Sequence, residues 1–393
     1  MKISKKLILL MTSAVLACSF DTPALAETVD LRQYAHGISY VENPVSHKSC
    51  IIWSDAYKKG VDRDGSWTHD VYRMTLNPDK PKLHSAKRII RAYEAQEPAS
   101  ASCTDDGMMI VTFEDGNDAG DYELAQRYSI YDKRMKAVKK YPATIAMGGH
   151  SGHAASTAKN HLVFWSEGWI DGGGVDDLGS GDDLYLTAMD SKGDNAKTID
   201  VAVSDKTRDW WPMIATSESK ALLVWQRYLN DKDYAQLCTA MYDPASGDLK
   251  TMSVNEKAHY YNYNAIYLKN LHLFAVNVTT VEKDGVLLLI NENGQTVRRI
   301  DKCKAFVREA SPAIKYTDDG VKLYYPVCNS DVECISIKNN LTAKSRILSG
   351  NYDWPECGVA GFTDNKGNPW FAALDVKKFK KHKKTVKLIS FTD

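Results

Sequence analysis

Residues 311–325 read SPAIKYTDDGVKLYY, and this short stretch contains the pattern on which the fold depends. Asp318-Asp319-Gly320 is a turn signal between two strand-like runs. The run after the turn, 323–325, is apolar and aromatic, as expected of a strand buried in a sheet. The unit is therefore a strand, a tight turn and an apolar strand that ends in aromatic residues.

The same unit recurs along the whole chain of 393 residues. Its spacing is roughly 50 residues, which is the length of a four-stranded propeller blade. The strands that follow the apolar ones alternate as half-buried strands do, at 70–74, 183–187 and 332–337. The predicted apolar strands are 50–53, 109–113, 162–165, 222–225, 271–274, 323–325 and 370–372.

These repeats predict an all-β fold, a β-propeller of seven four-stranded blades, with six or eight blades as alternatives. The last unit is short of one strand, and residues 28–34 have strand character. We expect this N-terminal strand to complete the last blade and close the ring, because closure removes exposed sheet edges. Two packed β-sandwich domains are the alternative reading.

Residues 311–325 also resemble the repeat of TolB-like and other WD40-like bacterial propellers. The resemblance lies in the Ser-Pro pair, the Asp-Gly turn and the aromatic strand. It implies a propeller fold and export from the cytoplasm. Many TolB-like propellers are non-catalytic interaction modules of the cell envelope, so the resemblance also implies a protein partner as one possible ligand.

The N-terminus has the pattern of a secretory signal. An apolar stretch at 7–17 follows a basic start that holds Lys2, Lys5 and Lys6, and Ala24-Leu25-Ala26 fits signal peptidase cleavage. We therefore expect a signal peptide at 1–26 and a single propeller domain at 27–393, periplasmic or secreted. No other segment is long and apolar enough to cross a bilayer.

Two cysteine features bear on the exported state. Residues 15–18 resemble a lipobox, so a lipid anchor on Cys18 is an alternative to cleavage after Ala26. Seven cysteines follow Ala26, and an exported chain can keep disulfides. Cys328 and Cys334 flank a predicted turn and are the simplest pair to expect, while the odd count leaves at least one thiol free or paired with another molecule.

Charge narrows the choice of partner. The chain carries 50 basic and 50 acidic side chains, so no overall positive field favours nucleic acid. A nucleophilic triad, a phosphate-binding glycine loop and a nucleotide fold are all missing from the sequence. The repeated Asp-box of sialidases is missing too.

The propeller geometry gathers the candidate site residues. Loops that lead into the innermost strands and the ends of the second strands meet on one face near the axis. The catalytic candidates there are His150, His153, Arg227 and Tyr228. The ligand-binding candidates are Glu167, Trp169, Asp209, Trp210, Trp211, His259, Tyr260, Tyr263, Arg308, Glu309, Trp354 and Glu356.

Aromatic rings beside arginine, histidine and carboxylate favour a glycan ligand. Rings stack on the apolar faces of sugars, and arginine binds a carboxylate through two parallel hydrogen bonds. We therefore expect a glycan or acidic polysaccharide as ligand, and a polysaccharide lyase as one possible activity, with histidine as the base. Structural roles are the alternative to ligand binding, since tryptophans such as Trp211 and Trp354 often pack between sheets and a single histidine is more often structural.

The loop 171–183 is rich in glycine and aspartate and predicts a possible calcium site. Calcium prefers oxygen ligands from carboxylates on a flexible loop, although the spacing here is not that of an EF-hand. The metal candidates are Asp176, Asp177, Asp182 and Asp183. A solvated acidic loop is the alternative.

Overall fold

The computed structural model describes residues 37–56, 69–122, 124–167, 183–204, 206–229, 234–328, 330–374 and 386–391. In these ranges the regular structure is β-strand, apart from one turn of 3-10 helix, η2, at Gly120–Tyr122. The predicted signal peptide at 1–26, the strand at 28–34 and Cys18 lie outside the described residues. So do Trp169, Asp176, Asp177 and Asp182.

The first three sheets are antiparallel, with four strands each in chain order. The first contains β1 (Ile38–Asn43), β2 (Lys48–Ala56), β3 (His69–Leu76) and β4 (Lys87–Ile90). The second contains β5 (Glu97–Cys103), β6 (Met109–Asp115), β7 (Ala125–Tyr131) and β8 (Ala137–Met147). The third contains β9 (His150–Ser156), β10 (Asn160–Glu167), β11 (Asp183–Asp190) and β12 (Lys197–Ala202).

The next eight strands repeat this order twice but share hydrogen bonds. The first half contains β13 (Asp209–Thr216), β14 (Ala221–Tyr228), β15 (Tyr234–Asp243) and β16 (Asp248–Met252). The second half contains β17 (Lys257–Leu268), β18 (Leu273–Thr280), β19 (Asp284–Asn291) and β20 (Thr296–Lys304). A short β15–β17 pairing, from Tyr234↔His259 to Gln236↔Lys257, joins the halves into one eight-stranded sheet.

The C-terminal part holds one sheet of four strands and one in which three strands are described. The four are β21 (Ala313–Thr317), β22 (Gly320–Val327), β23 (Asp331–Lys338) and β24 (Ala343–Leu348). The three are β25 (Val359–Thr363), β26 (Pro369–Leu374) and β27 (Val386–Ser390). The stretch 311–325 thus forms the β21–β22 hairpin, as its turn signal predicts.

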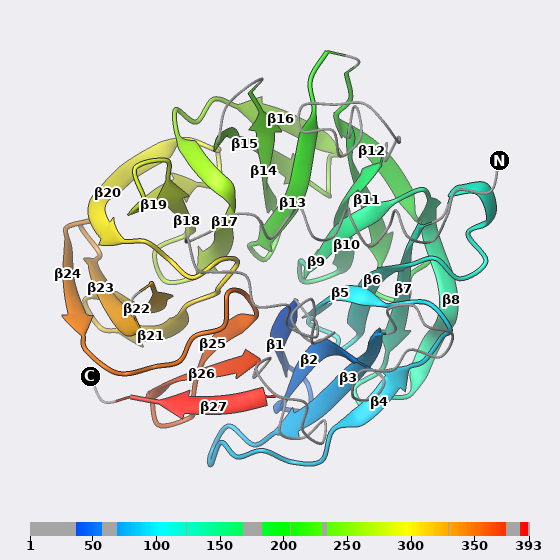
Figure 1. The fold of residues 1–393 in the computed structure, drawn as a ribbon, viewed down its shortest axis with the longest axis horizontal. Helices are drawn as coiled ribbons and strands as arrows, with labels where there is room; N and C mark the ends of the chain where they lie inside the picture. Colours follow the sequence, from blue (N-terminus) through cyan, green and yellow to red (C-terminus); the bar gives the residue numbers. More distant parts are fainter. Residues whose placement is uncertain are drawn as a thin grey trace, which may run out of the picture.

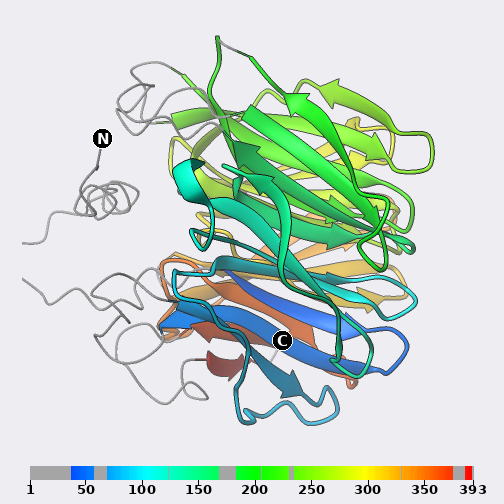
Figure 2. The same ribbon diagram turned by 90° about the vertical axis from the view of Figure 1, so that its right-hand side faces the viewer.

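The sheets are arranged around a common centre, with the first strand of each unit innermost (Figure 1). Seen from the side, the strands run from one broad face of the molecule to the other (Figure 2). The last sheet lies next to the first, where the Tyr40 and Phe362 rings stack at 4.7 Å and Ile51 and Trp53 share a core with Ala372. This arrangement is that of a β-propeller, and it differs from two separate sandwiches.

The predicted apolar strands are confirmed as the second strand of each unit: β2, β6, β10, β14, β18, β22 and β26. Such a strand is covered on both faces by neighbouring sheets, so its side chains are almost entirely buried, as Trp53, Phe113, Phe164 and Trp225 are. One boundary differs. His272 has a φ of 51° in the turn before β18, which begins at Leu273 and not at 271.

Glycine allows a close approach between two units. Gly361 on β25 faces the start of β21, and its backbone N–H donates to the Ser311 carbonyl at 3.0 Å. A Cβ atom on Gly361 would lie 2.1 Å from the backbone nitrogen of Ala313 and the carbonyl carbon of Pro312. Only glycine fits this contact between the last two sheets.

The predicted Cys328–Cys334 disulfide is not formed, and all seven cysteines in the described ranges are free thiols. The β22–β23 register explains this result. Cys334 lies opposite Tyr324, whereas Cys328 follows the end of β22 and its Sγ contacts the Phe306 carbonyl at 3.7 Å. The described part of the chain contains no helix that is long and apolar enough to span a membrane.

Candidate functional site

Four residues with left-handed backbone mark successive starts of inner strands. Ser151, Trp211, Tyr261 and Glu309 have φ values of 55°, 59°, 61° and 56°. Three of them lie at register shifts in the β9–β10, β13–β14 and β17–β18 pairs. Bulges of this kind redirect side chains, and non-glycine residues in this conformation often lie at functional sites.

These bulges bring four side chains together, and we name His153, Trp211, Tyr261 and Arg308 the central arc. The rings of His153 and Trp211 are 6.2 Å apart, and those of Trp211 and Tyr261 are 4.9 Å apart. The Arg308 guanidinium lies 5.3 Å from the Trp211 ring and 4.6 Å from the Tyr261 ring. The arc therefore joins four consecutive units through aromatic and cation–π contacts.

Glu309 compensates the charge of Arg308. Its Oε1 accepts a hydrogen bond from Arg308 Nε at 2.8 Å, and the two side chains are 7% and 14% exposed. Burial alone would lower the pKa of Arg308, but Glu309 together with Cys357 and Tyr261 outweighs burial, and the pKa is raised. Arg308 therefore stays charged within the arc.

A second aromatic group packs beside the arc. The Arg208 guanidinium lies 4.8 Å from the Trp210 ring and 4.7 Å from the Tyr228 ring. The Trp210 ring is also 6.2 Å from the His150 ring. Arg208 and Arg308 thus repeat one arrangement, a guanidinium over two rings, at positions 100 residues apart.

The tyrosines of this region differ in their roles. The hydroxyls of Tyr228 and Tyr261 are 2.8 Å apart, and Gln226 Nε2 donates to Tyr228 at 3.0 Å. Tyr260 is half-buried, and its ring lies 5.0 Å from that of Tyr228. Tyr263 is fully buried and donates to the Trp211 carbonyl at 2.6 Å, so it holds the bulge in place.

Asp209 and Arg227 form a pair next to this group. Asp209 Oδ1 accepts from Arg227 Nε at 2.8 Å and from Trp225 Nε1 at 2.6 Å. Arg227 and Tyr228 are neighbours on β14, so their side chains point to opposite faces of the sheet. The structure therefore does not bring Arg227 and Tyr228 to one point, although both were candidates for the same site.

The two candidate histidines are held through Ser151. The His150 Nδ1 atom lies 3.1 Å from the Ser151 hydroxyl, to which Trp210 Nε1 donates at 3.3 Å. His153 Nδ1 donates to the Ser151 carbonyl at 3.0 Å. A carbonyl can only accept, so Nδ1 of His153 carries the proton and Nε2 is the basic nitrogen of the neutral ring.

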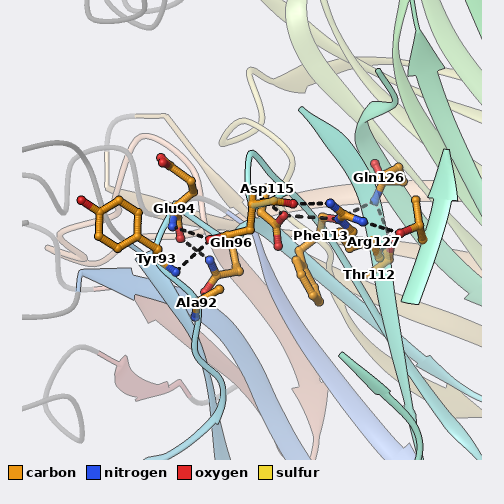
Figure 3. A network of polar contacts seen from close by, with 11 residues as sticks. Ala92, Tyr93, Glu94, Gln96, Thr112, Phe113, Asp115, Gln126 and Arg127 are labelled. Atoms are coloured by element: carbon orange, nitrogen blue, oxygen red, sulfur yellow. Dashed lines mark hydrogen bonds and ion pairs between the residues drawn. The ribbon is translucent and has the colours of Figure 1, made fainter. Parts of the chain in front are cut away.

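Figure 3 shows Gln126 and Arg127 of β7 in a network of polar contacts, and Gln126 also positions the bulge at 150–153. Gln126 Nε2 donates to Thr112 Oγ1 at 2.7 Å and to the Phe113 carbonyl at 3.0 Å. The same side chain accepts the Gly152 N–H at 2.9 Å. Arg127 next to it pairs with Asp115 at 3.3 Å. The backbone that carries both histidines is thereby fixed from the second sheet.

Two acidic groups lie near the His150–Ser151 pair. Glu114 accepts the Ser151 backbone N–H. Burial raises the pKa of Glu167, Asp183 raises it further, and the nearby His150 lowers it in part. Asp183 itself accepts the Ser204 N–H at 2.9 Å. Glu167 is therefore a carboxylate with an increased tendency to carry a proton beside a histidine.

The remaining candidates are spread around the centre. His259 is half-buried on β17, where it pairs with Tyr234. Trp354 stacks on Tyr352 at 5.1 Å and donates to the Asp331 carbonyl at 2.9 Å, so it packs between the last two sheets. Glu356 is exposed.

The predicted calcium site cannot be assembled from the described residues, because its loop lies outside them and only Asp183 is described. The described ranges contain no group of three or more His, Cys, Asp or Glu side chains arranged for a metal.

Sequence reasoning left out several residues that hold the site together. Ser151 links both histidines, Gln126 fixes their backbone, and Tyr261 lies at the middle of the central arc. Arg208 lies in the loop 208–212 that leads into an inner strand, but it was not named as a candidate, although it occurs two repeats before Arg308. Comparing the same repeat position across units would have found Arg208. The hydrogen bond between Gln126 and the Gly152 N–H joins two different sheets, and no pattern in the sequence predicts it.

Comparisons with known proteins concern shape only. No family model matches the chain, and a search of curated proteins finds no match. Among solved structures, the NanB sialidase of Streptococcus pneumoniae is 11% identical, with 99% of this chain and 72% of that chain covered and a TM-score of 0.48. A fucose-recognising, six-bladed lectin of Aleuria aurantia is 8% identical, covering 81% and 96%, with a TM-score of 0.43. The acylaminoacyl peptidase of Pyrococcus horikoshii is 10% identical, covering 92% and 51%, with a TM-score of 0.48.

Proposed function

We propose that this protein is an exported propeller of seven blades that binds an acidic glycan at the central arc. The observation that carries the proposal is the position of Arg308, over the rings of Trp211 and Tyr261, with the His153 ring in contact with that of Trp211. Rings offer flat apolar surfaces for sugar faces, and arginine offers paired donors for a carboxylate.

Partly exposed polar groups around the arc supply further contacts for sugar hydroxyls. His153, His259 and Tyr260 are half-buried, and Arg308 remains 14% exposed. The buried layer beneath them, which includes Trp210 and Tyr228, holds them in fixed positions. A rigid set of rings and donors loses little entropy on binding, which favours recognition of a flexible sugar chain.

The test compares a uronate polymer with its methyl-esterified form, in which the carboxylates are neutral. We expect the purified chain to bind the free acid more tightly, and Arg308→Gln to lose about tenfold or more in affinity, as for a charge-assisted contact. Arg299→Gln is the matched control, because Arg299 also pairs with a glutamate, Glu256 at 2.6 Å, on the outer strand β20.

Equal binding of both polymers, or equal losses in the two variants, would contradict an acidic-glycan site at the arc. If no glycan binds, the alternative of a non-catalytic envelope module that recognises a protein gains support. An aromatic and arginine-rich surface also suits a protein partner.

A polysaccharide lyase is the second candidate, and the orientation of His153 favours it. With Nδ1 bonded to the Ser151 carbonyl, Nε2 is the nitrogen that can take a proton from the carbon next to a uronate carboxylate. The bond to the leaving sugar oxygen then breaks, a carbon–carbon double bond forms, and the oxygen is protonated. Growth of ultraviolet absorbance from the unsaturated uronate, lost in His153→Ala, would establish this activity.

Export is part of the proposal and is tested separately. We expect the mature chain from the native host to begin at residue 27 and to be recovered from the periplasm or the medium. A mature chain that begins at Cys18 and carries a lipid would instead indicate an anchored lipoprotein. Recovery of the uncleaved chain from the cytoplasm would contradict export.

A further inference from the structure

Sulfur-containing side chains meet in a cavity between the first two sheets, away from the central arc. The cavity has a volume of about 50 Å³, which is enough for a single ion. Cys50 on β2, Cys103 on β5, Met109 on β6 and Met135 in the β7–β8 turn all line it. The same four residues belong to one packed cluster.

Cys50, Met109 and Cys103 are neighbours across the interface between the two sheets. The Sγ of Cys50 lies 3.9 Å from the Sδ of Met109. Met109 is the direct cross-strand partner of Cys103 in the β5–β6 pair, so these two side chains are neighbours on the same face. Met109 thus neighbours both cysteines, Cys50 through the sulfur–sulfur contact and Cys103 through the strand pairing.

The polar groups around the cavity suit a negatively charged metal–thiolate centre. Asn43 Nδ2 donates to the Cys103 Sγ at 3.6 Å, the kind of contact that orients a sulfur ligand. Arg73 lines the cavity, and its buried Nε has no hydrogen-bond partner in the described ranges. The cavity lining includes no carboxylate, which disfavours hard cations such as calcium and magnesium.

We propose that this cavity binds one soft monovalent metal ion of the cuprous class through Cys50, Cys103 and Met109. Thiolate and thioether are the ligands that such ions prefer. Each thiol releases its proton to solvent as its sulfur bonds the metal, so one ion and two thiols give a bis-thiolate of charge −1 and two protons. The oxidation state of the metal and of the sulfurs does not change, and the nearby Arg73 balances the charge.

The experiment uses the reduced, purified chain under anaerobic conditions. Cuprous ion is titrated in competition with a coloured cuprous chelator, and silver ion serves as a second probe that does not change oxidation state. We expect one equivalent to be bound per chain. Met109→Leu conserves volume and should preserve the fold, yet it should weaken binding at least about tenfold, and Asn43→Ala should weaken it about 10- to 100-fold.

The matched control is Cys328→Ser, which removes an exposed thiol from another sheet and should leave binding unchanged. Cys50→Ser and Cys103→Ser should each abolish retention of the metal against the chelator. Failure of the wild-type chain to hold cuprous ion, or equal losses in Met109→Leu and Cys328→Ser, would overturn the proposal. A Cys50–Cys103 disulfide in the untreated exported chain, together with no metal binding after reduction, would also overturn it.

Discussion

Asp209 offers the sharpest test of how the candidate site is built, because one buried carboxylate binds three donors from separate residues. It accepts from Trp225 Nε1 at 2.6 Å, from Arg227 Nε at 2.8 Å and from Thr207 Oγ1 at 2.8 Å. The residue is 1% exposed. Its place at the start of β13 also makes it the anchor of the Trp210–Trp211 bulge.

Asp209→Asn keeps the shape but leaves only one acceptor oxygen and turns an amide N–H toward donors. At least one hydrogen bond to the carboxylate is lost, at about 1.5 to 3 kcal/mol each. Arg227 is 37% exposed and remains hydrated, so the loss of its ionic partner adds at most about 1 kcal/mol. We expect a total loss of about 3 kcal/mol in the free energy of unfolding.

The assay is denaturant unfolding followed by tryptophan fluorescence, combined with binding of the uronate polymer. Asp209→Asn should lower both stability and affinity, because Trp211 belongs to the central arc. Asp364→Asn is the control, since Asp364 also accepts a tryptophan N–H, from Trp370 at 3.1 Å, but lies outside the arc. An Asp209→Asn protein as stable as the wild type, or an Asp364→Asn protein with an equal loss of binding, would refute this reasoning.

Three further predictions follow from buried contacts. Burial lowers the pKa of His161 from 6.5 to about 4. Between these pH values the unfolded chain binds a proton that the folded chain does not, so the free energy of unfolding should fall by about 3 kcal/mol as the pH drops from 6.5 to about 4. His161→Gln should flatten that slope in unfolding measured between these pH values. Gly361→Ala should separate the last sheet from its neighbour through backbone overlap and yield soluble protein only in low amount. Gly247→Ala has open space but a φ of 80°, so it should cost only about 1 to 2 kcal/mol of backbone strain and still yield soluble protein. Tyr261→Phe removes the 2.8 Å hydrogen bond to Tyr228, so the free energy of unfolding in denaturant should fall by about 1 kcal/mol and uronate affinity in a titration should weaken. Unchanged stability and affinity would contradict the role of Tyr261 in the central arc.

Much of the fold could be predicted because the apolar residues of each buried strand are contiguous in the sequence and do not depend on contacts with other units. Runs such as 162–165 and 222–225 are buried on both faces, and burial on both faces demands continuous apolar sequence. The boundary error at 271 has a local cause as well. Leu271 and His272 continue the apolar and aromatic pattern of the strand in the sequence. In the structure they lie in the turn before it, because His272 adopts a left-handed backbone conformation that reverses the chain.

The candidate site was predicted in part. Histidine, tryptophan and arginine at the starts of inner strands were identified, since the repeat places those starts on one face. Arg227 and Tyr228 were grouped together because both lie at the end of a second strand, and the alternation of side chains along β14 separates them. The Cys328–Cys334 pair was expected from sequence proximity, and the β22–β23 register sets the two cysteines apart.

The sequence by itself determined the class of fold and the repeated four-strand unit. Those properties follow from local patterns of apolar residues and turns, which act within each unit. Only the tertiary structure decided which side chains meet, such as Arg308 with Trp211 and Cys50 with Met109. These contacts join separate units, and their geometry depends on bulges and on the packing of one sheet against the next.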